Sequence, residues 1–359
     1  MFSFIVRRTG HGLLVLLGVL VLVFLLFNVL PGDPARLAMG QRVNQKSLDI
    51  IHKDMGLDEP VYNRFLLYVN DLSPISIYNE SVMGSHIYLD HEKYPHTIRL
   101  LKFSSNRALI LKFPYLRRSY QSRKPVSDII MSALPNTAVL AFSAIIIASV
   151  LGIIMGIIAA LFKDSIYDKV SIVLSVLGLA GPSFFTGLII AWLFGHVLHR
   201  YTGLNITGNL FIMDDGGNKI LQLKNLILPA LTLGIRPLAI IVQLTRNSML
   251  QVMTKDYIRT AFAKGLSLRV VVTKHAVKNM LNPVITAISG WFASLIAGAV
   301  FVEYIFGWEG IGKNIVDALG TFDMPVIMGI ILVTAALFVI INILVDISYG
   351  LLDPRIKQV

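Results

Sequence analysis

The stretch of this chain that comes closest to a chemical motif is glycine-rich: Gly307-Trp-Glu-Gly-Ile-Gly-Lys-Asn314. It nearly matches the phosphate-binding pattern G-x-x-x-x-G-K-[ST], in which backbone amides cradle phosphates and a hydroxyl binds Mg²⁺. Asn314 carries no hydroxyl, and no predicted strand precedes the motif. We therefore interpret the stretch as a turn that caps a short interfacial or re-entrant helix, and not as a nucleotide site.

Histidines are the other residues that could bind a metal or take part in catalysis. His86, His91 and His96 recur every five residues, which suits neither one face of a helix nor one face of a strand. His196 and His199 lie three residues apart near the end of an apolar run. We read the first set as loop histidines and the second as an interfacial pair. Because no Ser/His/Asp or paired-carboxylate arrangement stands out, we predict no catalytic residue, no cofactor and no metal site.

Composition sets the class of protein. Of 359 residues, 55% are hydrophobic and only 15% are charged, and the mean hydropathy is +0.70. Soluble domains carry roughly 25% charged residues, so this is an integral membrane protein. The net charge of +11 is dispersed between apolar runs, which favours the positive-inside bias of a multi-span protein over nucleic-acid binding. The absence of cysteine excludes disulfides and a thiol nucleophile.

Apolar runs long enough to cross a bilayer occur along most of the chain, since about 20 helical residues span the roughly 30 Å hydrocarbon core. The first is too long for a signal-peptide core and ends in Pro31-Gly-Asp-Pro34 without a cleavage site, so we predict a retained span. Gly181-Pro182, Pro229 and Pro237 predict kinks. The six runs are 11–30, 139–162, 170–198, 226–250, 284–306 and 325–349.

Basic residues orient these spans. With Arg7-Arg8 inside, the segment 251–282, which carries six Lys or Arg against one acid, also falls in the cytosol, as do both termini. Residues 31–136 fall outside and are too many for a structureless connector, so we predict a small extracytoplasmic domain. Within it, 49–67 is predicted as a helix and 87–113 to contain strands.

The most unusual segment is polar, basic and helix-forming, and it lies between two apolar runs. Asp256 is a candidate N-cap and Gly265 a helix stop. Ile258, Ala261 and Phe262 share one apolar face, which requires either lipid headgroups or a groove on a soluble partner. Ser267 is predicted to cap a second basic helix, 268–280. The segment consists of Asp256, Tyr257, Ile258, Arg259, Thr260, Ala261, Phe262, Ala263, Lys264 and Gly265.

These residues carry a family resemblance. Tyr257-Ile-Arg-Thr-Ala-Phe-Ala-Lys-Gly265, followed by His275, Asn279 and Pro283, resembles the cytosolic loop of ABC importer permeases, in particular the B-type subunit of dipeptide/oligopeptide importers. Arg259-Thr260-Ala261 stands where the broad family has Glu-Ala-Ala, as is usual in the peptide branch. Further matches are Pro31–Pro34, Gly56–Pro60, Leu134–Thr137, Phe306–Gly312 and Asp346–Arg355, whereas Tyr78–Leu116 is longer than its counterpart.

The resemblance implies an all-α polytopic membrane protein of six transmembrane helices, the type I importer permease fold, with an enlarged extracytoplasmic loop domain between helices 1 and 2. It implies a peptide permease in the bacterial inner membrane, working with a second homologous permease subunit, cytosolic ABC ATPases and an extracytoplasmic substrate-binding protein. ATP hydrolysis would occur on the ATPases, and 256–265 would couple to them. The implied parts are 1–30 (first span), 31–136 (loop domain), 137–350 (permease core with coupling loop 251–282) and 351–359 (tail).

A stand-alone secondary transporter or channel is the alternative function. It predicts ion-coupling residues within the membrane and internal repeats. We find no repeat, and the polar residues that we identify within the spans are only Asn28, Asn342 and Asp346. The sequence therefore favours the ATP-driven importer subunit over a carrier that works alone.

Overall fold

The computed structural model of the chain describes residues 2–29, 60–79, 89, 94, 97–102, 107–213 and 216–352. Two units divide the chain: one comprises Met1–Leu16, Ala133–Val316 and Thr334–Val359, and the other Leu17–Ser132 and Asp317–Val333. Pro31–Pro34, most of Gly56–Pro60, the histidines 86, 91 and 96, and the tail 353–359 lie outside the described residues, so the predictions made for them stay predictions.

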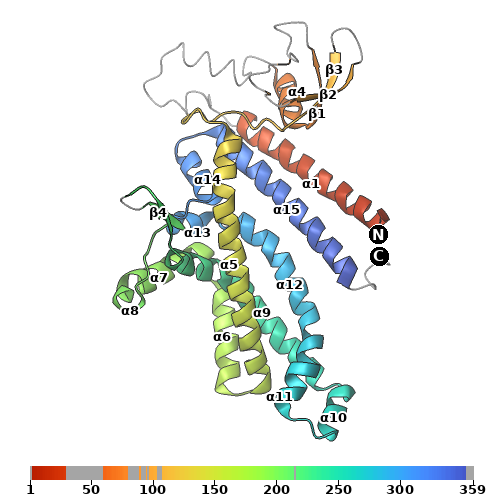
Figure 1. Cartoon of the computed structure of the whole chain (residues 1–359), viewed down its shortest axis with the longest axis vertical. Helices are drawn as coiled ribbons and strands as arrows, with labels where there is room; N and C mark the ends of the chain where they lie inside the picture. The colour runs from red at the N-terminus through yellow and green to blue at the C-terminus, as the bar shows by residue number, and fades with distance from the viewer. Residues whose placement is uncertain are drawn as a thin grey trace. The chain divides into compact units, whose positions relative to one another are not determined.

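Helices dominate the described residues, which confirms the helical polytopic class (Figure 1). Five of them are long and apolar enough to cross a membrane, and a sixth span results if one bent pair counts as a single crossing. The five stretches are Val6–Leu26 within α1 (Phe2–Val29), α5 (Val126–Leu161), α9 (Lys224–Met253), Leu268–Gly298 and Met324–Ile347 within α15 (Met324–Leu352).

The run 170–198 is sharply bent at Gly181-Pro182, where the sequence predicted a kink. It is split into α6 (Ile166–Ala180) and α7 (Ser183–Trp192), which meet at 115°. Pro182 has no amide hydrogen and disfavours the helical conformation of the residue before it, and Gly181 is accordingly extended. A π-helical turn, Leu193–Val197, and α8 (His199–Thr202) follow α7. By contrast, α9 continues as one helix through Pro229 and Pro237.

Small residues let the helices of the first unit approach closely. A Cβ on Gly156 of α5 would lie 2.7 Å from the carbonyl oxygen of Val242, and one on Gly234 of α9 would lie 2.9 Å from that of Ala144. Such positions are typical of membrane helix packing, where backbone proximity replaces the hydrophobic driving force. The helix α9 also packs against α6 and α12 (Val277–Gly298), which makes it central to this unit.

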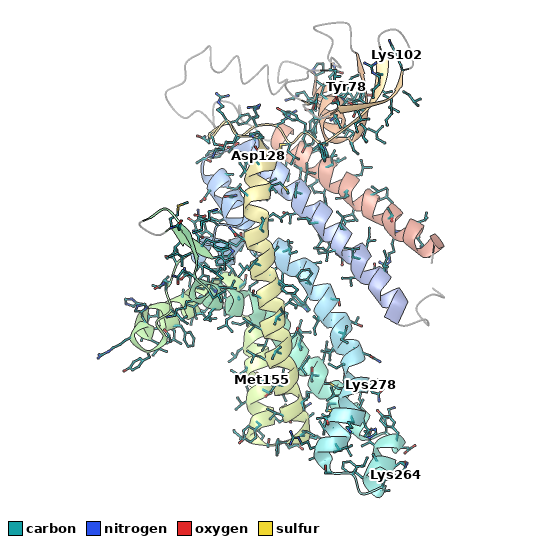
Figure 2. All side chains as sticks on the ribbon, in the orientation of Figure 1. Tyr78, Lys102, Asp128, Met155, Lys264 and Lys278 are labelled. Carbon is teal, nitrogen blue, oxygen red and sulfur yellow. The ribbon has the colours of Figure 1, made fainter. Side chains whose placement is uncertain are left out.

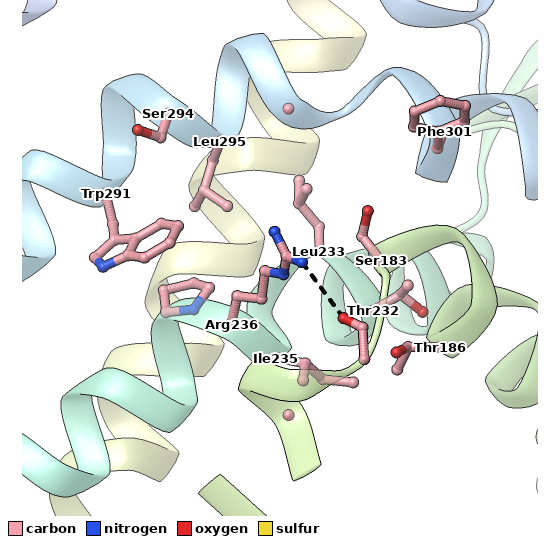
Figure 3. Close-up of a pocket in the computed structure, with 14 residues that line it drawn as sticks. Ser183, Thr186, Thr232, Leu233, Ile235, Arg236, Trp291, Ser294, Leu295 and Phe301 are labelled. Atoms are coloured by element: carbon pink, nitrogen blue, oxygen red, sulfur yellow. Dashed lines mark hydrogen bonds between the residues drawn. The ribbon is translucent and has the colours of Figure 1, made fainter. Parts of the chain in front are cut away.

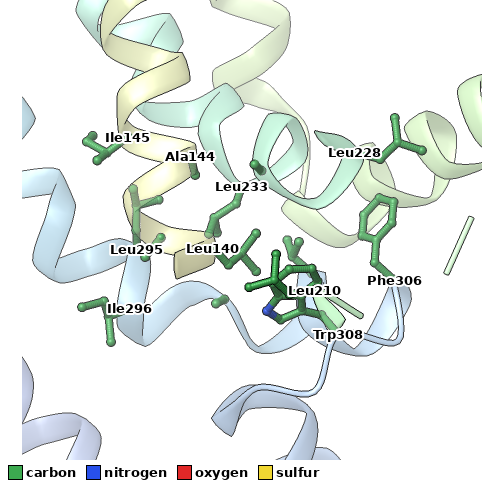
Figure 4. Packing of buried hydrophobic residues seen from close by; sticks show 14 of the residues in the cluster. Leu140, Ala144, Ile145, Leu210, Leu228, Leu233, Leu295, Ile296, Phe306 and Trp308 are labelled. Carbon is green, nitrogen blue, oxygen red and sulfur yellow. The ribbon is translucent and has the colours of Figure 1, made fainter. Parts of the chain in front are cut away.

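A hydrophobic cluster joins α5, α9 and the chain that follows α12 (Figure 4). Leu140 of α5, Leu228 of α9 and Leu295 of α12 meet in it, together with the fully buried Phe306 and Trp308. The indole Nε1 of Trp308 donates a hydrogen bond to the carbonyl of Asn136 at 3.0 Å, so the large ring is buried without an unpaired donor. Between Phe306 and α14 (Ile311–Gly320) lies the glycine-rich turn, and α13 (Val300–Ile305) precedes it.

One buried ion pair ties α6 to α9. Arg246 donates from Nε to Asp168 Oδ1 at 2.5 Å and from a terminal nitrogen to Oδ2 at 2.8 Å, a bidentate arrangement. The Asp168 side chain is buried, and its carboxylate also accepts the Asp164 amide at 3.0 Å. Arg246 lies within the predicted span 226–250, where the sequence reading overlooked it.

We expect Asp168→Asn to lower the unfolding temperature of the detergent-solubilised protein, because the partly buried Arg246 guanidinium would lose its charged partner. Breaking such a pair removes about 3 kcal/mol of stability. Asp164→Asn in the same turn is the matched control, since Asp164 is exposed, interacts with Arg246 more weakly than Asp168 does, and asparagine tolerates its left-handed φ of 64°. We would measure the unfolding temperatures of both variants. A wild-type unfolding temperature for Asp168→Asn would contradict this role.

The second unit contains a small sheet. After α4 (Val61–Leu72), strands β1 (Ile75–Asn79), β2 (Thr97–Lys102) and β3 (Arg107–Lys112) pair antiparallel in the order β1-β3-β2. The strands predicted within 87–113 are thereby confirmed. Because of these strands, the term all-α does not describe the second unit. The described part of the predicted helix 49–67 begins at Val61 and continues to Leu72. A separate hairpin, β4 (Phe211–Met213) with β5 (Lys219–Leu221), belongs to the first unit.

Buried polar side chains fix this sheet to α4. The hydroxyl of Tyr94 donates to Asp71 Oδ1, and Lys112 Nζ donates to the Asp71 carbonyl oxygen at 2.6 Å while lying 4.6 Å from the centre of the Tyr94 ring. Burial raises the pKa of Tyr94 far above its ordinary value, so the hydroxyl remains a donor. The described residues of 60–132 therefore contain a packed core, in which Asp71 joins α4 to the sheet.

Candidate functional site

The segment predicted to couple to a partner forms a short helix, α10 (Asp256–Ala263), as expected. Lys255 is extended and occupies the N-cap position, so Asp256 is the first helical residue and not the cap. Its carboxylate still complements the positive end of the helix, and Arg259 lies 3.8 Å from it. Gly265 has a φ of 76°, which confirms it as the helix stop, because a side chain there would be strained.

The apolar face of α10 is buried by the chain itself. Ile258 is fully buried and Ala261 nearly so, in a cluster with Met249 of α9 and with Val271 and Met280 beyond the turn. The expectation that this face requires lipid or a partner is therefore wrong for Ile258 and Ala261. The reason is that the chain reverses after Gly265 and covers them, a tertiary contact that local spacing does not reveal.

What α10 leaves exposed is aromatic and basic. Tyr257 and Phe262 are 42% and 41% exposed, and Thr260, Ala263 and Gly265 are also exposed. The exposed bases of 251–282 are Lys255, Arg259, Lys264, Arg269, Lys274 and Lys278, of which Lys264 and Lys278 are labelled in Figure 2. Asn279 Nδ2 donates to the Tyr257 hydroxyl at 3.0 Å, which fixes that ring to α12. We call Tyr257, Arg259, Phe262 and Lys264 the α10 surface.

The second basic helix does not end near Met280 as predicted. Helical structure runs from α11 (Leu268–Val270) through a π-helical stretch, Val271–Ala276, into α12 and so to Gly298. Pro283 lies inside this helix rather than at its boundary. Ser267 occupies the predicted N-cap position, although its side chain makes no capping bond. The cluster under α10 is therefore continuous with a membrane-crossing helix, and π-helical turns are frequent at functional sites.

The glycine-rich turn binds a carboxylate of its own chain. Glu303 is fully buried; its Oε2 accepts the amides of Gly312 at 2.6 Å and Lys313 at 3.2 Å, and its Oε1 accepts the Thr137 hydroxyl at 2.6 Å. The amides that would cradle a phosphate in the similar motif are thus occupied. This turn caps a short helix, α14, as predicted, and the sequence reading missed Glu303 because its partners follow nine and ten residues later or come from α5.

The predicted spans contain more charged residues than Asp346 alone. Arg236 and Arg246 both lie in α9, and the predicted run 226–250 includes them. Asp346 pairs with Arg8 at 3.2 Å, and Asn342 donates to the Phe338 carbonyl at 2.8 Å. His199 Nδ1 lies 2.6 Å from the Leu204 carbonyl oxygen. Among the described residues, no group of three His, Asp or Glu side chains is placed to hold a metal.

Known proteins resemble the whole chain. Residues 152–358 match the family described as "Binding-protein-dependent transport system inner membrane component", and residues 1–85 match the N-terminal region of such membrane components. The chain is similar to the di/tripeptide transport system permease protein of Pseudomonas aeruginosa (strain UCBPP-PA14), with 34% identity over 100% of this chain and 99% of that protein.

Two further relatives have comparable coverage. The dipeptide transport system permease protein of Escherichia coli (strain K12) is 32% identical over 100% of this chain and 99% of that protein. A putative peptide transport system permease protein of Brucella abortus (strain 2308) is 33% identical over 99% of both chains. The similarity therefore extends through the α10 segment, the glycine-rich turn and the residues before α5.

Proposed function

The chain belongs to the binding-protein-dependent transport system inner membrane component family, and we propose that it is the membrane-spanning permease subunit of an ATP-driven importer for short peptides. The full-length similarity to permeases named for di/tripeptide, dipeptide and peptide transport carries this proposal. The spans would form half of the translocation path, and a second, homologous permease subunit would form the other half.

ATP hydrolysis would take place on separate cytosolic ATPase subunits, and an extracytoplasmic binding protein would deliver the peptide. The occupied glycine-rich turn supports the first point, because Glu303 already takes the amides of the phosphate-like motif. We place the protein in a bacterial inner membrane with both termini and residues 251–282 in the cytoplasm, which the basic residues of that segment support. Residues 31–136 would be the extracytoplasmic domain, 137–350 the permease core and 351–359 the tail.

The α10 segment, Asp256–Gly265, would dock on an ATPase and transmit its movement. The packing of α10 supports this mechanism: Ile258 is fixed in the cluster with Val271 and Met280, and that cluster continues into α12. A displacement of α10 would therefore move α12 as a rigid lever rather than deform a flexible loop. Closure and opening of the ATPase pair would alternate the access of the path, a hinge-type transition.

Reconstitution tests the function. We expect the complex of this chain with its companion permease, ATPases and binding protein to accumulate a labelled dipeptide in proteoliposomes when ATP is supplied on the ATPase side. A non-hydrolysable ATP analogue should support no accumulation. If this chain alone accumulated dipeptide in response to an ion gradient and without ATP, it would be a stand-alone secondary transporter, and the proposal would be wrong.

A further inference from the structure

A cavity of about 350 Å³ lies among the helices of the first unit (Figure 3). Its walls come from the bent pair α6 and α7, from α9, and from α12 with α13. On α12 the lining positions Trp291, Ser294, Leu295 and Gly298 follow helical spacing, so one face of that helix borders the cavity. The volume lies within the range of small-molecule sites, and the walls combine aromatic rings with hydroxyl groups, as such sites do.

Arg236 supplies a positive charge to this cavity. It lies near the middle of α9, a membrane-crossing helix, where an arginine is costly and marks a functional site by default. Its terminal nitrogen donates to the Gly181 carbonyl at 3.4 Å, a long contact that leaves most of the guanidinium's donors for another acceptor. None of the described residues that line the cavity is acidic. The guanidinium of Arg236 is therefore available to bind an anionic ligand that enters the cavity.

A second observation comes from Thr232, one helical turn before Arg236 and on the same face of α9. Thr232 is 4% exposed and lines the cavity, yet its hydroxyl has no hydrogen-bond partner. Thr186 of α7, by contrast, donates to the Pro182 carbonyl at 3.2 Å. A buried hydroxyl without a partner is unfavourable, so a hydrogen-bond acceptor placed beside Thr232 would be stabilised there.

An acceptor lies beside these donors. Pro237 lacks an amide hydrogen, so the carbonyl of Leu233, four residues earlier and also at the cavity, loses its usual helical donor. The cavity thus combines a guanidinium and a hydroxyl that donate with a carbonyl that accepts. This combination matches a peptide, which carries a carboxylate at one end and amide or ammonium hydrogens along the rest.

We propose that this cavity binds the transported peptide in transit, with Arg236 holding a carboxylate of the peptide and Thr232 donating to the same end. The proposal rests on the peptide-import function above. A guanidinium binds a carboxylate through two parallel hydrogen bonds, a geometry that lysine cannot reproduce. Trp291 and Phe301 offer apolar surfaces for peptide side chains. The carboxylate is either the C-terminus or an acidic side chain.

Direct binding distinguishes these sources. We would measure the affinity of the complex in nanodiscs, without binding protein, for trialanine, for its C-terminal amide, and for the amide of Ala-Glu-Ala. If the C-terminus is held, the wild-type complex should bind trialanine at least tenfold more tightly than the trialanine amide. If an acidic side chain suffices, the Ala-Glu-Ala amide should bind as tightly as trialanine. Equal affinities for all three would overturn the proposal.

Variants complete the test. Arg236→Gln should lower trialanine affinity and uptake at least tenfold and abolish the preference for a carboxylate, and Arg236→Lys should restore part of both. Arg200→Gln, an exposed change in α8, is the matched control and should transport as wild type. If Arg236→Gln breaks the complex while Arg236→Lys keeps full uptake, Arg236 holds a subunit and the proposal is wrong. Wild-type complex without any ATP-driven uptake would instead contradict the proposed function.

Discussion

Phe262→Ala should abolish ATP-driven uptake and leave the permease folded in the membrane. Phe262 is 41% exposed on α10 and belongs to the α10 surface, so its truncation opens no cavity in the protein. Aromatic residues dominate the binding energy of docking surfaces, and removing one reduces affinity by about 2–4 kcal/mol, or roughly 30- to 1,000-fold. We expect the ATPase to be lost during purification and uptake to fall to background.

The neighbouring Ile258→Ala provides the contrast, because Ile258 is fully buried in the cluster with Met249 and Val271. We expect it to remove about 2–5 kcal/mol of stability, so that the unfolding temperature falls before ATPase binding is affected. Phe211→Ala, which truncates an exposed phenylalanine of β4, should change neither quantity. If Phe262→Ala retained the ATPase and full uptake, the docking site would lie elsewhere.

Local features of the fold could be predicted from the sequence. The length of an apolar run determines whether a helix can cross the membrane, and turn chemistry is local, so the position of α10 and its end at Gly265 followed from a few residues. The strands within 87–113 followed from alternation. In each case the information lies within one segment, which is why the prediction succeeded.

Packing between segments was not predictable in the same way. The burial of Ile258 depends on residues beyond the turn. The kink at Gly181-Pro182 was predicted from the sequence, but its angle of 115° was not. Arg236 could have been found, since a charge within a 25-residue apolar run is visible in the sequence, but its position at a cavity beside Thr232 could not.

Loss of the hydrogen bonds that the Glu303 carboxylate accepts should reduce the stability of the first unit more than any other single change. It accepts two backbone amides at the start of α14 and the Thr137 hydroxyl, while that hydroxyl accepts the Ile311 amide at 2.9 Å. Glu303→Ala would leave buried donors without acceptors, each worth about 1–3 kcal/mol. We expect the free energy of unfolding to fall by about 5 kcal/mol. The unfolding temperature and the yield of protein in the membrane should fall accordingly.

Gly312→Ala should have a similar effect from the other side of the contact. Its Cβ would lie 2.5 Å from the Val300 Cα, a backbone atom that cannot move aside, and 2.8 Å from Glu303 Oε2. The substitution would therefore push α14 away from the carboxylate without changing any charge. Glu309→Ala, in the same turn but exposed, is the matched control and should unfold as wild type. Normal stability of Glu303→Ala would mean that solvent or a partner chain satisfies these donors, and that the turn is not held by Glu303.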